Sequence, residues 1–233
     1  MHPPGDQLLS ALMGRYDVVE EKIRIADRVF SLFMVRDTNA LLENLSAEDL
    51  SCNDRFPFWA QLWESSLALA EWSLSSPRLE GATVLELGAG LGLAGIAAAS
   101  AGAHVTLTDY ASDALTCATL NAVKNLSLGE CARTSVAHLD WRSTFDLPRH
   151  DFIIGADILY ETTVFQPLME LFRAALAPGG SIVLADPDRA TGRLFLASAE
   201  ERGFTVSAHA RVVHRHGGSC QITIAELREQ SRG

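Results

Sequence analysis

The sequence lacks the features that mark secreted, membrane-spanning and metal-binding proteins. Its 233 residues include only four cysteines, and no two of them have the Cys-x-x-Cys spacing of a zinc or redox site. Such scatter is typical of free thiols in a reducing compartment. The chain has no run of about 18 apolar residues, and its N-terminus has no basic and apolar leader. We therefore expect a cytoplasmic protein with no bound metal and no membrane association.

Positive charge is also scarce. The chain has 19 lysines and arginines against 29 aspartates and glutamates, which gives a net charge of -10. No cluster of basic residues offsets this charge, so the surface repels a phosphate backbone and we expect no nucleic-acid partner. An acidic surface favours a cationic partner instead.

Beyond residue 82, short apolar runs alternate with helical patterns, which predicts a parallel sheet covered by helices on both faces. Two strand-like runs at 204–214 and 220–226 are too close together for a crossover helix, so they predict an antiparallel C-terminal hairpin. The expected fold class is α/β, a doubly wound Rossmann-like seven-stranded sheet. Its other predicted elements are strands at 82–87, 103–108, 133–139, 151–156 and 180–185 and helices near 91–101, 112–124, 163–177 and 189–202.

The first 55 residues form a predicted extension packed on this core. Alternating apolar residues predict two strands at 18–25 and 29–35, and a helix follows from Thr38 through Leu45. Residues 56–233 form the predicted α/β domain, which begins with an amphipathic helix from Phe58 to Leu74. With 48% hydrophobic residues, the chain is able to bury a substantial core.

Residues 83–95 carry the most specific signal in the chain. They read as a buried strand that ends in a glycine turn and opens a helix, where glycines permit positive φ angles and let a ligand approach the backbone. The spacing of Gly90, Gly92 and Gly95 satisfies the dinucleotide pattern. Glu86-x-Gly88-x-Gly90 is the form that S-adenosylmethionine enzymes use. The loop alone leaves both cofactor classes open.

Polar and aromatic residues follow the next two strands. In a doubly wound sheet the ligand lies at the carboxyl ends of the strands. Asp109 follows the second strand, 19 residues beyond Gly90, where a carboxylate can accept both ribose hydroxyls. Asp140 and Trp141 follow the third, as an acceptor for an adenine amino group beside an aromatic wall. The alternatives are a solvated turn for Asp109 and core packing for Trp141.

Asp157 and Tyr160 follow the fourth strand, at the position nearest the reactive end of a cofactor. The alternative is a strand-end carboxylate with the tyrosine packed in the core. We expect Tyr110 and Ala156, which neighbour the strand-end acids, to contact the cofactor as well. The run 186–189, Asp-Pro-Asp-Arg, faces the same cleft, although a helix-starting turn explains it equally well.

These motifs occur together with Pro178-Gly179-Gly180 and the terminal hairpin, and the combination resembles the class I S-adenosylmethionine-dependent methyltransferases over roughly residues 80 to 226. Within that class, the aromatic run 56–64 and the Asp157-x-x-Tyr160 motif resemble methyltransferase family 16. That family includes the seven-strand protein lysine methyltransferases.

The resemblance implies S-adenosylmethionine as cofactor, S-adenosylhomocysteine as product and a protein substrate with an accessible lysine as partner. It implies that Trp63 lies near the methionine moiety of the cofactor and that Glu86, Gly88 and Gly90 belong to the cofactor site. Asp157 would orient the acceptor ammonium. Tyr160 would brace Asp157 or line the acceptor channel.

Three alternatives stay open. A small-molecule N-methyltransferase of nicotinamide type, with a small amine as its acceptor, would suit the same motifs. An NAD-dependent oxidoreductase would explain the Gly90, Gly92 and Gly95 spacing, and a cofactor-binding pseudoenzyme would have the motifs without the activity. Amide or nucleobase methylation fits less well, because Ile158 and Leu159 stand where an Asn-Pro-Pro-Tyr element has prolines.

Overall fold

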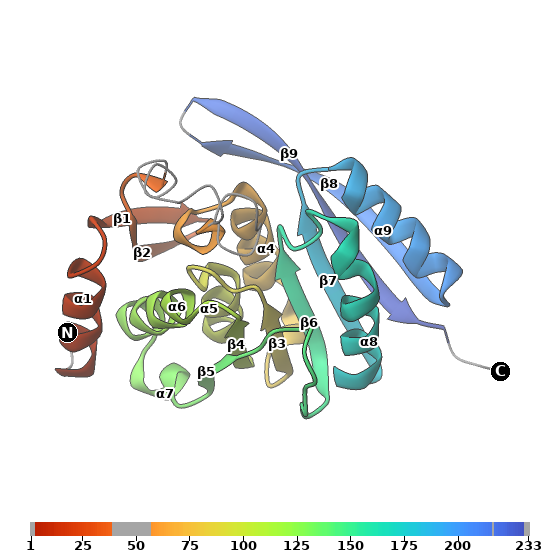
Figure 1. The fold of residues 1–233 in the computed structure, drawn as a ribbon, viewed down its shortest axis with the longest axis horizontal. Coiled ribbons are helices and arrows are strands. Elements are labelled where there is room, and N and C mark those ends of the chain that lie inside the picture. Colours follow the sequence, from red (N-terminus) through yellow and green to blue (C-terminus); the bar gives the residue numbers. More distant parts are fainter. Residues whose placement is uncertain (1–2, 39–56, 216, 231–233) are drawn as a thin grey trace.

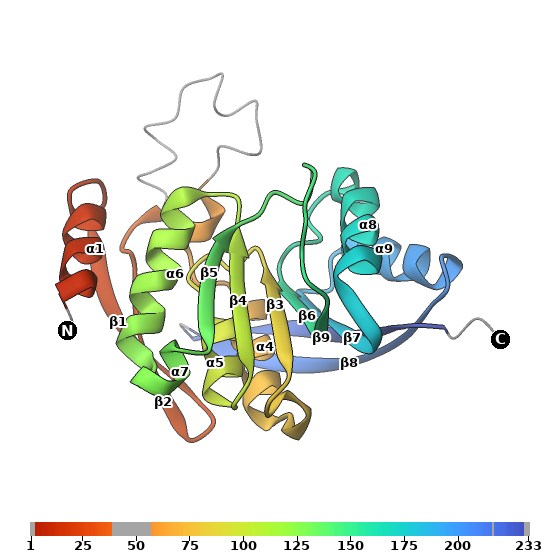
Figure 2. The ribbon, with the colours of Figure 1, turned by 90° about the horizontal axis from the view of Figure 1, so that it is seen from below.

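A computed structural model describes residues 3–38, 57–215 and 217–230. Its centre is a seven-stranded sheet with strand order β5-β4-β3-β6-β7-β9-β8 (Figures 1 and 2). The strands of this sheet are β3 (Thr83–Leu87), β4 (His104–Asp109), β5 (Thr134–His138), β6 (His150–Ala156), β7 (Leu176–Asp186), β8 (Phe204–Arg215) and β9 (Gly218–Glu229).

The first five strands of this sheet are parallel, and β9 pairs antiparallel with both β7 and β8. The predicted fold class is therefore confirmed, including the C-terminal hairpin. Strand β9 pairs with β7 only through residues 223–227, so the rest of the hairpin projects past the carboxyl end of β7 (Figure 1).

Helices cover both faces of the sheet and bury two apolar clusters. One cluster joins the sheet to α4 (Glu64–Ser75), α5 (Leu93–Ser100) and α6 (Ser112–Asn125). The other joins it to α8 (Phe165–Ala175) and α9 (Ala190–Glu201). Helix α5 is almost entirely buried, because its alanines and Gly95 let it lie close to β3 and β4. This packing fixes the turn between β3 and α5.

The predicted N-terminal hairpin is present as β1 (Val18–Ile25) and β2 (Arg28–Val35). It packs on α6, where Asn121 receives a hydrogen bond from the Phe33 amide at 2.7 Å and returns one to the Phe33 carbonyl at 3.1 Å. Helix α1 (Pro3–Met13) was not predicted. The predicted helix from Thr38 to Leu45 lies outside the described residues from position 39 on, and the domain boundary at residues 55 and 56 stays a prediction.

Two predicted boundaries are wrong by several residues, and one short helix was not predicted. The helix expected from Phe58 is a single 3-10 turn, η2 (Phe58–Ala60), and α4 begins only at Glu64, because Trp63 is extended and its indole Nε1 donates to the Phe58 carbonyl at 2.8 Å. Strand β7 begins at Leu176 rather than 180, where a register shift against β6 accommodates the Pro-Gly-Gly segment. A short helix, α7 (Leu128–Cys131), follows the capping box of Ser127 and Glu130. Two further 3-10 turns are η3 (Pro77–Leu79) and η4 (Thr162–Val164).

Candidate active site

A pocket lies at the carboxyl ends of β3, β4 and β6 and is closed on another side by the segment that leads into α4. Ten of the eleven site residues predicted above line it, and Asp140 does not. The residues around it are Phe58, Trp59, Gln61, Leu62, Trp63, Ser66, Glu86, Gly88, Ala89, Gly90, Leu91, Leu93, Asp109, Tyr110, Trp141, Ala156, Asp157, Ile158 and Tyr160.

The glycine turn forms the floor of this pocket. Gly88 and Gly90 have backbone φ angles of 62° and 52°, which residues with a side chain rarely adopt. A Cβ at Gly88 would lie 2.9 Å from Ile158 Cγ2, and one at Gly90 would lie 3.3 Å from the Trp59 carbonyl oxygen. Glycine is therefore required at both positions for the backbone angle and for space, and the hollow above the turn stays open.

Glu86 lies beneath the turn. Its side chain accepts a hydrogen bond from the Gly95 amide at 3.1 Å, and only 3% of the residue is exposed. Burial raises the pKa of Glu86 to about 8, because the charged form loses its hydration. A Cβ at Gly95 would collide with this carboxyl group and with Leu107, so the glycine lets the first turn of α5 reach Glu86.

Asp109 holds the turn from the end of β4. Its two carboxylate oxygens accept hydrogen bonds from the amides of Gly90 at 3.0 Å and Ala111 at 2.9 Å. Burial raises the pKa of Asp109 above its ordinary value, and these amides oppose the rise. Each carboxylate oxygen has a second lone pair. The side chain is thus able to brace the loop and still accept hydrogen bonds from a ligand.

Trp141 and Asp140 differ in their surroundings. Trp141 is 7% exposed and lines the pocket, and its indole Nε1 has no hydrogen-bond partner among the described residues. Asp140 lies in an adjacent smaller hollow, where its carboxylate receives two hydrogen bonds from the Arg142 guanidinium at 2.9 and 3.0 Å. Arg142 in turn lies over the ring of Tyr110, at 5.5 Å from its centroid. Trp141 therefore offers a free donor to a ligand, whereas Asp140 holds an arginine.

Aromatic side chains surround one side of the pocket. The ring centroid of Phe58 lies 6.3 Å from that of Trp63 and 6.1 Å from that of Tyr160. Trp59 packs against Tyr16, which precedes β1. The two rings are T-shaped, with their centroids 5.4 Å apart. The extension thus supports the backbone that lies over Gly90. These apolar rings reduce access of water to whatever occupies the pocket.

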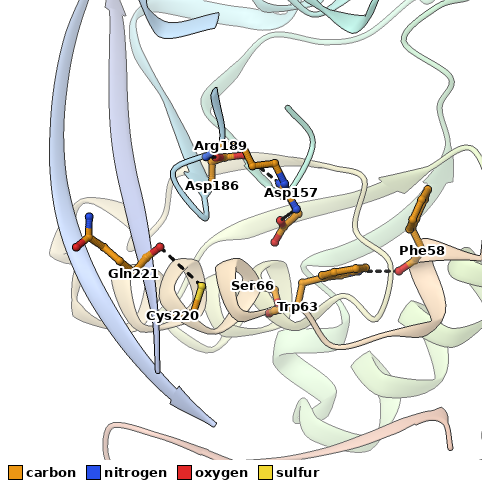
Figure 3. A network of polar contacts seen from close by, with 8 residues as sticks. All are labelled: Phe58, Trp63, Ser66, Asp157, Asp186, Arg189, Cys220 and Gln221. Carbon is orange, nitrogen blue, oxygen red and sulfur yellow. Dashed lines mark hydrogen bonds and ion pairs between the residues drawn. The ribbon is translucent and has the colours of Figure 1, made fainter. Parts of the chain in front are cut away.

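Asp157 stands where β6 ends and has a φ of 59°, a left-handed angle for a residue with a side chain. Its amide donates to the Ala185 carbonyl at 2.9 Å, and its carboxylate forms an ion pair with Arg189 at 2.6 Å (Figure 3). Its pKa is raised by burial, while Ser65 and Arg189 oppose the rise. A buried carboxylate thus borders the pocket opposite the indole of Trp63.

Sequence reasoning gave no role to Ser66 and left the role of Arg189 open. Ser66 lines the pocket from the first turn of α4, where its hydroxyl donates to the Trp63 carbonyl at 2.7 Å. Arg189 was recognised only as part of a helix-starting turn or a cleft segment. Its position after the fifth parallel strand was the available signal, because neighbouring strand ends lie side by side.

Two searches of the described part of the chain gave no candidate. No helix in it is long and apolar enough to cross a bilayer. No group of three or more histidine, cysteine, aspartate or glutamate side chains in it has the arrangement of a metal site.

Comparisons with known proteins agree with this geometry. A family model described as lysine methyltransferase matches residues 57–202. Protein N-lysine methyltransferase METTL21A of Danio rerio is 37% identical over 129 residues, which cover 54% of this chain and 58% of that protein. EEF1A lysine methyltransferase 3 of Mus musculus is 36% identical over 135 residues, which cover 56% of each. The matches thus span little more than half the length of these relatives.

A solved structure has the same fold. The crystal structure of ribosomal protein L11 methylase from Lactobacillus delbrueckii subsp. bulgaricus superimposes with a TM-score of 0.58 at 17% identity. The superposition covers 90% of this chain and 99% of that chain.

Proposed function

The chain belongs to the lysine methyltransferase family, which uses S-adenosylmethionine, and we propose that it methylates a lysine side chain of a protein substrate. The observation that carries the proposal is Asp157. It is a buried carboxylate that borders the glycine-turn pocket, across from Trp63 and Ser66. An anionic group beside a cofactor pocket attracts an ammonium group.

The residues present fit S-adenosylmethionine. A Cβ at Gly88 would enter the pocket beside Ile158 and Trp141, and the buried Trp141 Nε1 lacks a partner among the described residues. We propose that Asp109 and Trp141 hold the adenosine part and that Trp63 lies against the methionine part. When bound, the cofactor supplies an electrophilic methyl group on a positively charged sulfur.

The protein's own task is then to hold a lysine amine in line with that methyl group. Lysine has an ordinary pKa of about 10.4, and only the neutral amine has a free electron pair. Asp157 attracts and orients the ammonium form. The apolar rings of Phe58 and Trp63 lower the local polarity and favour loss of the proton. Tyr160 borders the same space and lines the acceptor channel.

The acceptor class follows from the relatives and from charge. The names of the relatives describe lysine methylation of proteins, and one of them names the elongation factor EEF1A as the substrate of that relative. The net charge of -10 favours association with a basic protein surface. We therefore propose a basic protein as the partner and the cytoplasm as the site of the reaction.

Asp157→Asn tests the proposal. Asparagine keeps the shape of the side chain and tolerates a positive φ, but it lacks the charge. With tritiated S-adenosylmethionine and cell extract, wild-type protein is expected to label a protein band on lysine, and the variant to label it about 100-fold more slowly or worse. Binding of S-adenosylhomocysteine, measured by calorimetry, should be retained.

Asp188→Asn is the matched control. Asp188 has a similar φ of 58° but lies at the surface, where it pairs with Arg193. This variant should label the band at the wild-type rate. Labelling of small molecules alone would favour an amine methyltransferase instead, and unchanged labelling by Asp157→Asn would refute the role of Asp157.

A further inference from the structure

Two carboxylates lie side by side at the carboxyl edge of the sheet. Strands β6 and β7 pair Ala156 with Ala185, so the next residues, Asp157 and Asp186, are neighbours at this edge. Their side chains are only 11% and 7% exposed. Two buried carboxylates this close repel each other, and each lacks the hydration that would stabilise its charge. Such a pair requires a cation.

Arg189 supplies that cation and contacts both carboxylates (Figure 3). One guanidinium nitrogen lies 2.6 Å from Asp157 Oδ1, and another lies 3.1 Å from Asp186 Oδ2. The backbone amide of Arg189 also donates to Asp186 Oδ1 at 2.7 Å. Asp186 therefore anchors the start of α9 and aims the arginine at Asp157.

Gly192 makes this close approach possible. A Cβ at this position would lie 2.7 Å from Asp186 Oδ1, so any side chain would push the first turn of α9 away from the carboxylate. The glycine lies inside a helix, where it costs stability relative to alanine. Its presence is explained by the need to bring Arg189 over the two strand ends.

The other groups that face this cluster do not replace the arginine. Ser65 of α4 lies close enough to Asp157 to oppose the rise of its pKa. The charges of Glu64 on α4, Asp157 and Arg189 all affect the pKa of Cys220 on β9. Glu64 adds negative charge, and burial raises the pKa of the Cys220 thiol, which keeps it neutral. Among these neighbours, Arg189 supplies the positive charge next to Asp157.

We infer that Arg189 is a positioning residue that keeps Asp157 ionised and holds one of its carboxylate oxygens, so that the other is left for the acceptor ammonium. This inference rests on the proposed function. Asp157, Asp186 and Arg189 together carry one net negative charge, which a bound ammonium neutralises. Without the guanidinium, burial favours a proton on Asp157, and the attraction for the acceptor is weakened.

The direct test is a ¹³C NMR titration of aspartate-labelled protein, which needs no acceptor and no turnover. The Asp157 signal is assigned with Asp157→Asn. Arg189→Gln is expected to raise the pKa of Asp157 by about 1 to 3, the usual effect of a charge at this distance, and Arg189→Lys by less. Arg189→Met gives a second neutral variant in case the first does not fold. An Asp157 pKa equal to wild type in a folded neutral variant overturns the inference.

Arg193→Gln is the matched control, because it removes the same charge four residues later. Arg193 is 59% exposed and pairs with Asp188. This variant should leave the pKa of Asp157 unchanged. An equal rise in both variants would mean that the overall charge of α9, rather than the contact of Arg189, sets the ionisation of Asp157, and the inference would fail.

The second test is the pH dependence of kcat/KM with the extract protein that the wild type labels. Between pH 6.5 and 8.5 the logarithm of kcat/KM should rise with a slope of about one for wild type, because one proton leaves the acceptor amine. For Arg189→Gln, kcat/KM should fall more steeply than for wild type below the Asp157 pKa that the NMR titration gives for this variant, because Asp157 must lose a proton as well, and Arg189→Lys should restore the wild-type profile. Identical profiles down to that pKa refute the inference. Failure of the wild type to label any protein refutes the proposed function instead. The NMR titration then still tests whether Arg189 lowers the pKa of Asp157.

Discussion

Gly88→Ala should damage both folding and cofactor binding, because it combines two separate penalties. An alanine at a φ of 62° is strained by about 1 to 2 kcal/mol. Its Cβ would also lie 2.9 Å from Ile158 Cγ2 and 3.5 Å from the Trp141 ring. Overpacking of this kind costs about 1 to 3 kcal/mol more. The free energy of unfolding should therefore fall by about 3 kcal/mol.

Gly81→Ala separates the two penalties. Gly81 has a φ of 73°, yet a Cβ there would meet nothing within 4 Å. Urea unfolding should therefore give a loss of only about 1 kcal/mol for this variant. Calorimetry with S-adenosylhomocysteine should give at least about a tenfold weaker affinity for Gly88→Ala, equivalent to about 1.4 kcal/mol, and wild-type affinity for Gly81→Ala. Equal losses of stability together with unchanged affinities would refute the contact between the turn, Ile158 and the cofactor.

Two further changes test buried polar groups. Because burial raises the pKa of Glu86 to about 8, the folded protein keeps a proton that the unfolded chain loses above pH 4.5, so wild-type stability falls between these values. Glu86→Gln should remove this fall. In urea unfolding at several pH values, the free energy of unfolding of the variant relative to wild type should rise by up to about 1.4 kcal/mol per pH unit from pH 4.5 to 8 and then stay constant. A constant difference across that range would contradict the assignment. Asn121→Ala should lower the free energy of unfolding by about 3 kcal/mol, because it removes the hydrogen bonds of its side chain to the Phe33 amide, the Phe33 carbonyl and the Leu91 carbonyl. A loss below about 1 kcal/mol would mean that water replaces them.

The sheet was predictable because its strands are short, apolar and separated by helical patterns. The TVLEL run of β3 and the paired runs of β8 and β9 appear at nearly their observed positions. The ends of the helices and strands were harder to predict. Nothing in the local pattern of 58–74 indicates that the indole of Trp63 bonds back to the Phe58 carbonyl and delays the start of α4. Helix α1 was missed because it is short and depends on packing against α6.

The candidate site divides in the same way. Residues that directly follow parallel strands were predicted, because the topology alone brings strand ends together. The partner of each side chain was not predictable. Asp140 was expected to accept a hydrogen bond from an adenine amino group, which stays a prediction, and nothing in the sequence indicated that its carboxylate binds Arg142 two residues away. Arg189 was ambiguous in the sequence, because a charged residue at a helix start is usually explained by solvent exposure.

The sequence by itself determined the order of strands and helices, the glycine turn and the set of acidic and aromatic residues at the strand ends, because these depend on local periodicity and on the space that glycine leaves. Only the tertiary structure decided which charges meet. The ion pairs of Arg189 with Asp157 and Asp186 join residues up to 32 positions apart and depend on the register of β6 against β7 and on the approach of α9 at Gly192. Side-chain contacts act over a few ångströms, and no pattern along the chain records distances of that kind.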